Sequence, residues 1–127
     1  MIEVKEKVST LEEGIANLIK ASKEDFIQWS TRLAKLRGKE ELSKHSKYEI
    51  ANFYMQVSTG IKYIKLIRNN SVHSFIVKED SDKFKKGDIL MPSSWSKPAK
   101  NQARGNVLTG FLIEWTGPLY LNTEKFR

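Results

Sequence analysis

Several residue types and patterns are absent or scarce in this 127-residue chain, and each absence narrows what the protein can do. There is no cysteine, which excludes disulfides, zinc–thiolate sites and thiol catalysis. Only two histidines, His45 and His73, are present, so a histidine-rich metal site is not expected. No apolar run approaches the roughly 20 residues that a membrane span requires, and no signal peptide opens the chain. We therefore expect a cytoplasmic protein with no metal, no cofactor and no membrane partner.

Signatures of catalysis are also missing from the chain. It has no GxSxG, HExxH or phosphate-binding glycine-rich motif. The acids Glu79, Asp80 and Asp82 lie in one loop, but neighbouring acids in a loop more often form a solvated turn than an acid–base pair. The sequence therefore predicts a binding protein and not an enzyme.

Positive charge, by contrast, is abundant. Lysine and arginine total 22 against 15 acids, which gives a net charge of +7 and a pI of about 9.6. A chain this basic is expected to meet an anionic partner, and nucleic acid, a nucleotide or an acidic protein would all satisfy that. Between Lys83 and Arg104 there are six basic residues against a single acid, Asp88.

Helical signals dominate the first half of the chain. The capping box at residues 10–13 precedes an apolar stripe that reaches about residue 21, and a second stripe runs from residue 26 to residue 36. These two stripes belong either to two helices or to one helix with a break at Ser22. A further capping box at residues 46–49 precedes apolar residues at helical spacing and predicts a helix that ends at Gly60.

The second half of the chain changes to strand patterns. Four segments predict strands: residues 61–68, 72–77, 89–91 and 107–115. We therefore predict one domain over residues 1–127 of the α+β class, in which N-terminal helices precede a small antiparallel sheet of four or five strands. The helical part covers about residues 9–60 and the sheet part about 61–121. The helices are expected to cover one sheet face with Leu18, Ile19, Phe26, Leu33, Phe53 and Val57.

The candidate site lies between residues 71 and 106, where a strand pair leads into a basic loop. Phe75 is either a core residue or a platform for a base, because a ring face binds any nucleobase. Trp95, in the polar loop, allows the same two interpretations. Asp88 is either a turn residue or a ligand contact. In Arg104–Gly105–Asn106, glycine permits close backbone approach and the arginine fork matches phosphate oxygens, although a solvated loop is the alternative.

Four segments follow one another within about residues 63–118: SVHSFIVKED, GDIL, SSWSKPAKNQARGNV and WTGP. This ordered set resembles phage anti-Thoeris sponge proteins of the first type. That family sequesters cyclic ADP-ribose isomers, and some members also hold cyclic oligonucleotides. The resemblance implies that Phe75 stacks on the adenine, that Lys86 and Asp88 contact the base or ribose, and that Arg104 holds the phosphates. It also implies that Arg32 or Arg37, from a helix of an adjacent subunit, completes the pocket.

The resemblance further implies a homo-oligomer, a dimer or an assembly of dimers, that acts in the host bacterial cytoplasm during phage infection. The alternative is a small basic phage protein that binds RNA or DNA through the same loop. A third class, an interaction protein that blocks a host factor with its helical face, would need neither Phe75 nor Arg104.

Overall fold

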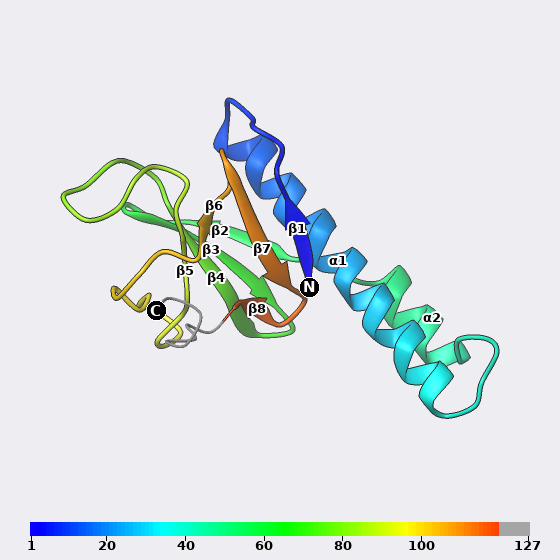
Figure 1. Cartoon of the computed structure of the whole chain (residues 1–127). Coiled ribbons are helices and arrows are strands. Elements are labelled where there is room, and N and C mark those ends of the chain that lie inside the picture. Colours follow the sequence, from blue (N-terminus) through cyan, green and yellow to red (C-terminus); the bar gives the residue numbers. More distant parts are fainter. Residues whose placement is uncertain (120–127) are drawn as a thin grey trace.

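The computed structural model describes residues 1–119 of the chain. Strand β1 (Ile2–Val4) comes first, followed by helix α1 (Leu11–Leu36) and helix α2 (Lys44–Ala51) (Figure 1). The later strands are β2 (Gln56–Thr59), β3 (Tyr63–Arg68), β4 (Ser71–Val77), β5 (Ile89–Leu90), β6 (Gly105–Asn106), β7 (Gly110–Glu114) and β8 (Gly117–Pro118). The predicted α+β class is confirmed. The end of the predicted sheet part, residues 120 and 121, lies outside the described residues.

Helix α1 is a single continuous helix of 26 residues, so neither the predicted second helix nor the predicted break at Ser22 is present. It begins as predicted, with the Thr10 side chain accepting a hydrogen bond from the Glu13 N–H at 3.2 Å. Ser22 does not start a second helix, because its hydroxyl donates to the carbonyl of Leu18 at 2.9 Å inside the same helix. The helix ends before Gly38, whose φ of 74° is a left-handed value that suits glycine.

The predicted helix over residues 46–60 is wrong in both its start and its extent. Helix α2 covers only Lys44–Ala51, and its cap is the side chain of Ser43, which accepts from the Ser46 N–H at 3.1 Å. Beyond it Phe53 and Met55 are both 8 % exposed, a spacing of two that belongs to extended chain. Val57 lies in β2 and is 46 % exposed, so it does not cover the sheet.

The strands form two four-stranded antiparallel sheets. One has the order β2-β3-β4-β5, and the other has the order β1-β7-β6 with β8 paired to β7. The charged N-terminal segment supplies the edge strand β1, in which Val4 pairs with Phe111. A backbone bridge between Asp88 and Asn106 joins the two sheets next to β5 and β6.

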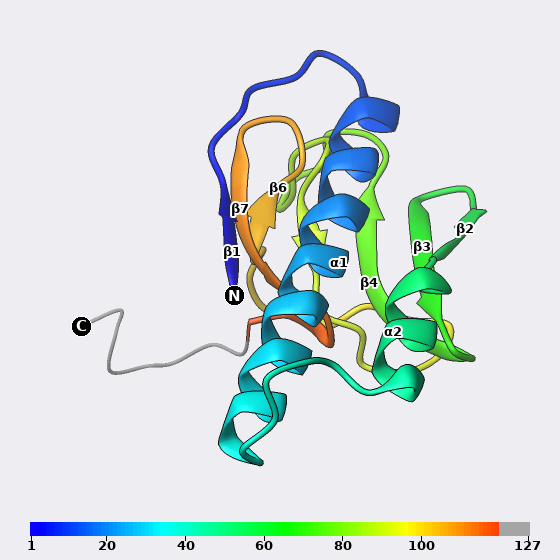
Figure 2. The same cartoon turned by 90° about the vertical axis from the view of Figure 1, so that its right-hand side faces the viewer.

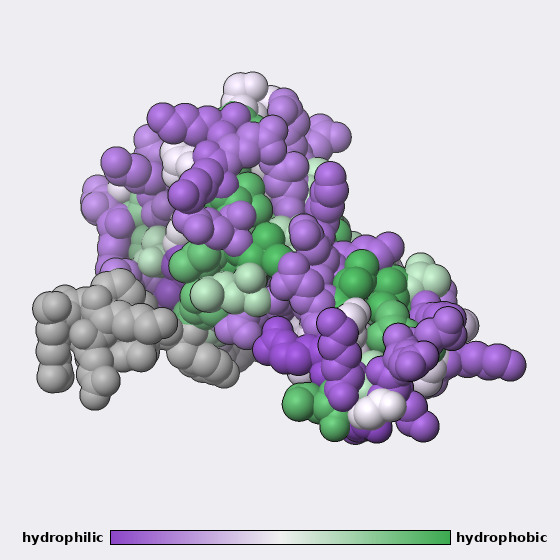
Figure 3. Space-filling view, turned by 45° about the vertical axis from the view of Figure 1, so that its right-hand side comes forward, coloured by the Kyte–Doolittle hydropathy of each residue, from purple (hydrophilic) through white to green (hydrophobic). Residues whose placement is uncertain are grey.

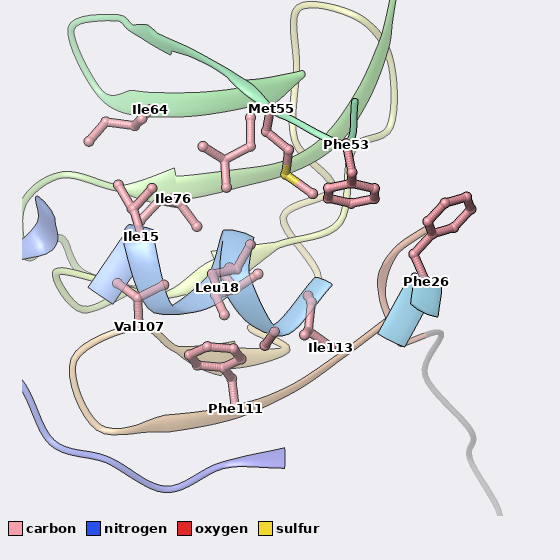
Figure 4. Close-up of a cluster of buried hydrophobic side chains, with 13 residues drawn as sticks. Ile15, Leu18, Phe26, Phe53, Met55, Ile64, Ile76, Val107, Phe111 and Ile113 are labelled. Atoms are coloured by element: carbon pink, nitrogen blue, oxygen red, sulfur yellow. The ribbon is translucent and has the colours of Figure 1, made fainter. Parts of the chain in front are cut away.

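The main core lies where α1 meets both sheets (Figure 4). Leu18 and Ile113 are fully buried, and Phe26 and Phe53 approach to 5.5 Å between ring centroids. A close approach fixes how α1 docks. A Cβ atom on Gly14 would lie 2.5 Å from the Val107 carbonyl oxygen, so only glycine fits there.

The molecule has two dissimilar sides. The C-terminal half of α1 and the neighbouring α2 form an arm that projects from the sheets, whereas the long loops before and after β5 lie on the opposite side (Figures 1 and 2). Apolar side chains gather in separate areas over the sheets and over the arm (Figure 3), where Leu36 is 78 % exposed. Within residues 1–119 no helix combines the length and the hydrophobicity needed to cross a membrane.

Candidate functional site

The basic loops before and after β5, residues 78–88 and 91–104, are shaped by short polar side chains. Asp80 Oδ1 accepts from the Lys86 N–H at 2.8 Å, and Asp88 Oδ2 accepts from the Lys85 N–H at 2.9 Å. Ser81 Oγ accepts from the Phe84 N–H at 3.1 Å. Carboxylates and hydroxyls that accept from nearby backbone N–H groups stabilise turns. Asp80 and Asp88 therefore support the backbone of these loops.

The bridge between the sheets brings together three of the predicted site residues, Lys86, Asp88 and Asn106. The Asn106 amide donates to the Lys86 carbonyl at 2.9 Å and to Asp88 Oδ1 at 3.0 Å. Its Oδ1 accepts from the Leu108 N–H at 2.7 Å. The polar atoms of Asp88 and Asn106 are thus used within the protein, and the exposed Lys86 ammonium is the group directed to solvent.

Arg104 fastens its own loop. Its guanidinium donates to the Gln102 carbonyl at 3.1 Å, to the Leu119 carbonyl at 2.9 Å and to Asn101 Oδ1 at 3.1 Å. Partial burial lowers the pKa of Arg104, which remains a cation at neutral pH. Since a guanidinium has five N–H donors, two remain for an external oxygen.

Phe75 lies under the loops and not on the surface. It is 2 % exposed and packs with Val77, Phe84 and Leu90 in a second core on the outer face of its sheet. Its ring meets that of Tyr63 edge-on, with 6.0 Å between centroids. Of the two interpretations of Phe75, a core residue or a platform for a base, its burial in the structure therefore matches the core residue.

Trp95 is the aromatic residue that these loops expose. It is 54 % exposed, and the Lys65 ammonium lies 4.4 Å from the centroid of its indole. The same ammonium lies 5.9 Å from the centroid of Phe75. Trp95 therefore lies near Phe75, with Lys65 close to both rings, and it presents much of its own surface outward.

The lysines of the basic loops keep their charge available. The Lys83 ammonium donates to the Lys100 carbonyl, which ties the first loop to the second. The ion pairs found within residues 1–119 are Met1–Asp25, Glu3–Lys5 and His45–Glu49. In that part of the chain, no cation of the basic loops is neutralised by a carboxylate.

Arg32 and Arg37 are not brought to the basic loops within one chain. Arg32 is exposed on α1, and Arg37 caps the C-terminal end of this helix. This end belongs to the arm, on the opposite side of the molecule from the loops (Figures 1 and 2). Either arginine can reach the loops only in a second copy.

His73 is a buried titratable group whose ring is held by hydrogen bonds inside the protein. It is 3 % exposed, with Nε2 at 3.0 Å from the Glu114 carbonyl and Nδ1 at 3.0 Å from the Ser74 hydroxyl. Burial, more than the nearby Arg68 cation, lowers the pKa of His73 to about 4. Ser22 Oγ lies 3.4 Å from Nε2, but this buried pair has no route to a substrate.

Sequence reasoning missed a hollow of about 380 Å³ on the arm, between α2 and the turn joining β3 to β4. Arg68 lies in its wall, and Asn69 and Asn70 form the adjacent turn with left-handed φ values of 49° and 62°. The asparagine turn was recognisable in the sequence. Nothing local indicated that Arg68 would meet three aromatic rings from distant segments.

Among residues 1–119 no cluster of three or more His, Cys, Asp or Glu side chains is arranged to hold a metal ion. Comparison with known proteins finds no curated protein and no solved structure that matches the chain. A family model described as a family of unknown function, DUF7717, matches residues 3–120. The chain therefore belongs to the DUF7717 family.

Proposed function

We propose that the protein binds a cyclic nucleotide signal at its basic loops and holds it without converting it. The ligand class is the one that the sequence resemblance implies, a cyclic ADP-ribose isomer or a cyclic oligonucleotide, and the setting is the cytoplasm of an infected host. The observation that carries the proposal is the exposed indole of Trp95 with Lys65 against it, in basic loops whose lysines form no ion pair within residues 1–119.

Such a surface offers the two groups that a nucleotide requires. An exposed ring binds a base by stacking, which is worth roughly 1–3 kcal/mol per base. The ammonium groups of Lys83, Lys86 and Lys100 and the two spare donors of Arg104 supply charge for phosphate oxygens. In this proposal Trp95 takes the stacking role that the resemblance gives to Phe75, because Phe75 is covered.

The proposal that binding occurs without turnover rests on how the nearby acids are used. A general base must lie within hydrogen-bond reach of the proton it removes and must be free to accept it. Asp80 and Asp88 accept from backbone N–H groups of their own turns. These hydrogen bonds occupy carboxylate oxygens that a general base would need to keep free.

Isothermal titration of the full chain with cyclic ADP-ribose isomers and cyclic dinucleotides tests the site. Trp95→Ala is expected to weaken binding by about tenfold or more, as the loss of one stacked base implies. Tyr54→Ala removes another exposed ring, 71 % exposed, from the arm and serves as the matched control. Equal affinity of Trp95→Ala and the unaltered protein would remove the loops from the site.

Recovery of the ligand tests whether the protein converts it. Excess protein is incubated with the bound nucleotide, denatured by heat, and the released material is separated by chromatography. Intact ligand in full yield supports a sponge. A product that accumulates with time would instead identify a phosphodiesterase or glycohydrolase.

The alternative function is binding of single-stranded nucleic acid, which the spread of lysines over both loops favours. The dependence of affinity on salt separates the two. A strand that contacts many phosphates releases many counterions and loses affinity steeply as salt rises, whereas a small cyclic nucleotide gives a shallow slope.

Self-association is part of the proposal. Arg32 and Arg37 lie on the side of the molecule away from the loops, so the pocket that the resemblance implies requires a second copy. A closed dimer, or an assembly of dimers, would bring a helix arginine to a neighbour's loops. Sedimentation at micromolar concentration is expected to show no major monomer, and a monomer that binds ligand fully would contradict this.

A further inference from the structure

The hollow on the arm has the size and lining of a binding site in its own right. Its volume of about 380 Å³ lies within the range of roughly 300–1,000 Å³ usual for small-molecule pockets. Helix α2 forms one wall and the β3–β4 turn forms the other; both lie side by side in Figure 2. The lining residues are polar and aromatic, and they include His45, Tyr48, Glu49, Asn52, Tyr54 and Arg68.

Arg68 is the residue that gives this hollow its character. Its guanidinium carbon lies 5.0 Å, 4.6 Å and 5.1 Å from the ring centroids of Phe26, Phe53 and Trp115. Cation–π contacts of this kind hold a guanidinium in place without using its N–H donors. Within residues 1–119 Arg68 forms no ion pair, and its side chain donates no hydrogen bond.

Partial burial makes this cation favourable for an anionic partner. Desolvation lowers the pKa of Arg68, which means that its charge has lost part of its hydration without gaining a protein acceptor. A planar anion with two oxygens matches the fork of a guanidinium and would restore that solvation. The fixed aromatic surroundings mean that little side-chain freedom is lost on binding.

Two tyrosines flank the same space with open ring surfaces. Tyr48 is 68 % exposed on α2, and Tyr54 is 71 % exposed just after it. Asn52 is fixed next to them, because its amide donates to the Tyr48 carbonyl at 2.8 Å. Rings that are exposed next to a cation suit a ligand that carries a flat apolar group together with its negative charge.

The charge balance favours a single negative charge on the ligand. Glu49 lines the hollow and raises the pKa of Arg68, against the larger effect of burial. Its carboxylate pairs with His45 at the outer end of α2. A carboxylate, with one charge, therefore fits better than a phosphate dianion, which Glu49 repels more strongly.

We propose that the hollow between α2 and the β3–β4 turn binds a small aromatic carboxylate, with Arg68 on the carboxylate and Tyr48 and Tyr54 on the ring. This site is separate from the basic loops, which lie across the sheets from it. It uses one partly desolvated arginine in place of several solvated lysines.

The test uses two probes that share a ring and differ in charge, N-acetyl-L-tryptophan and N-acetyl-L-tryptophanamide. Each is titrated into the full ¹⁵N-labelled chain and followed by amide chemical shifts. The acid is expected to shift signals of residues 45–54 and 68–70, with a dissociation constant of about 1 mM or tighter. The amide is expected to bind about tenfold more weakly, since a charged hydrogen bond is lost. Equal binding of the two probes, or no shifts with the acid at roughly 10 mM, would overturn the proposal.

Variants assign the site within the same experiment. Tyr54→Ala is expected to weaken binding of the acid by about threefold to tenfold, with the fold unchanged because the side chain is exposed. Trp95→Ala, in the basic loops, is expected to leave this affinity unaltered. Arg68→Lys keeps the charge and loses the fork, but it also alters packing between the rings, so Tyr54→Ala is the decisive variant. Acid-induced shifts that disappear in Trp95→Ala and persist in Tyr54→Ala would place the ligand on the loops instead.

Phenyl phosphate distinguishes the two kinds of anion. It carries a smaller aromatic ring, a phenyl in place of an indole, and, at pH 7.5, close to two negative charges. Weaker binding than the acid is expected because Glu49 lies in the same hollow. Tighter binding at residues 45–54 would overturn the assignment of a carboxylate.

Discussion

The basic loops and the arm present positive charge in two different ways. In the loops, Asp, Asn and Ser side chains hold the backbone while several lysines extend into solvent. In the arm, one guanidinium lies among three aromatic rings and is partly removed from water. Solvated charges are screened within about 8 Å at physiological salt, whereas a desolvated charge is screened much less. The loops therefore suit a ligand with several phosphates, and the arm suits a single anionic group.

The largest expected effect separates the loop surface from the core beneath it. Phe75→Ala is expected to lower the free energy of unfolding by about 3–5 kcal/mol, because it removes a large ring from a buried cluster. Trp95→Ala, in the loop above, is expected to change it by less than about 0.5 kcal/mol. Denaturant unfolding of the two variants measures both values. A large loss in Trp95→Ala would mean that the loop is part of the core and not a free surface.

The fold was predictable from the sequence where local patterns agreed with tertiary packing. The cap at Thr10 and the apolar stripe behind it gave the start of α1 correctly, and alternation gave β4. The segment at Phe53 was predicted to be helical although it is extended chain. Over a few apolar residues, the spacing of two that is typical of a strand and the spacing of 3.6 that is typical of a helix coincide. Pairing of β2 with β3 decides that case, and this pairing is not visible in a single stretch of sequence.

The candidate site was predictable only in part. Lys86, Asp88 and Asn106 come together because they flank one bridge between strands. The exposure of Trp95 and the burial of Phe75 depend on how the loops fold back over the sheet, which residue type alone does not determine. Arg68 was missed since its partners Phe26, Phe53 and Trp115 are separated by many residues and meet only in the folded chain.

The next largest expected effect is a dependence of stability on pH that is caused by His73. The ring of this residue, on β4, links α1 to both sheets. Because the folded-state pKa is about 4 and the ordinary value is 6.5, the unfolded chain binds a proton that the folded chain does not. Stability is therefore expected to fall as pH decreases from 6.5 to 4, by about 3 kcal/mol in total, and to change little from this cause above 7. Unfolding at a series of pH values measures it.

Two comparisons control the interpretation of that pH profile. His45→Gln removes the exposed histidine and is expected to leave the profile nearly unaltered. A His73→Gln variant is expected to lose most of the dependence in this range, whatever its overall stability. An unaltered slope in that variant would assign the dependence to other groups.

A smaller effect distinguishes Arg104 from the lysines of the same loops. Arg104→Ala is expected to cost about 1–3 kcal/mol of stability, because its three hydrogen bonds hold residues 101–104 and the carbonyl of Leu119. Lys86→Ala removes a cation with an exposed side chain and is expected to change stability by less than about 0.5 kcal/mol. Equal thermal midpoints for the two variants would show that Arg104 does not fasten the loop.

The close contact at Gly14 has a consequence for other members of the family. With α1 docked as it is, any side chain at this position would collide with Val107 within 3 Å, on backbone as well as side-chain atoms. A relative that keeps this arrangement is therefore expected to keep glycine there, even where its surface residues have diverged. A relative with a larger residue at that position must carry its first helix further from β6 and β7, and the arm and its hollow would move with the helix. Position 14 thus offers a marker for sorting DUF7717 sequences into those that share this geometry and those that do not.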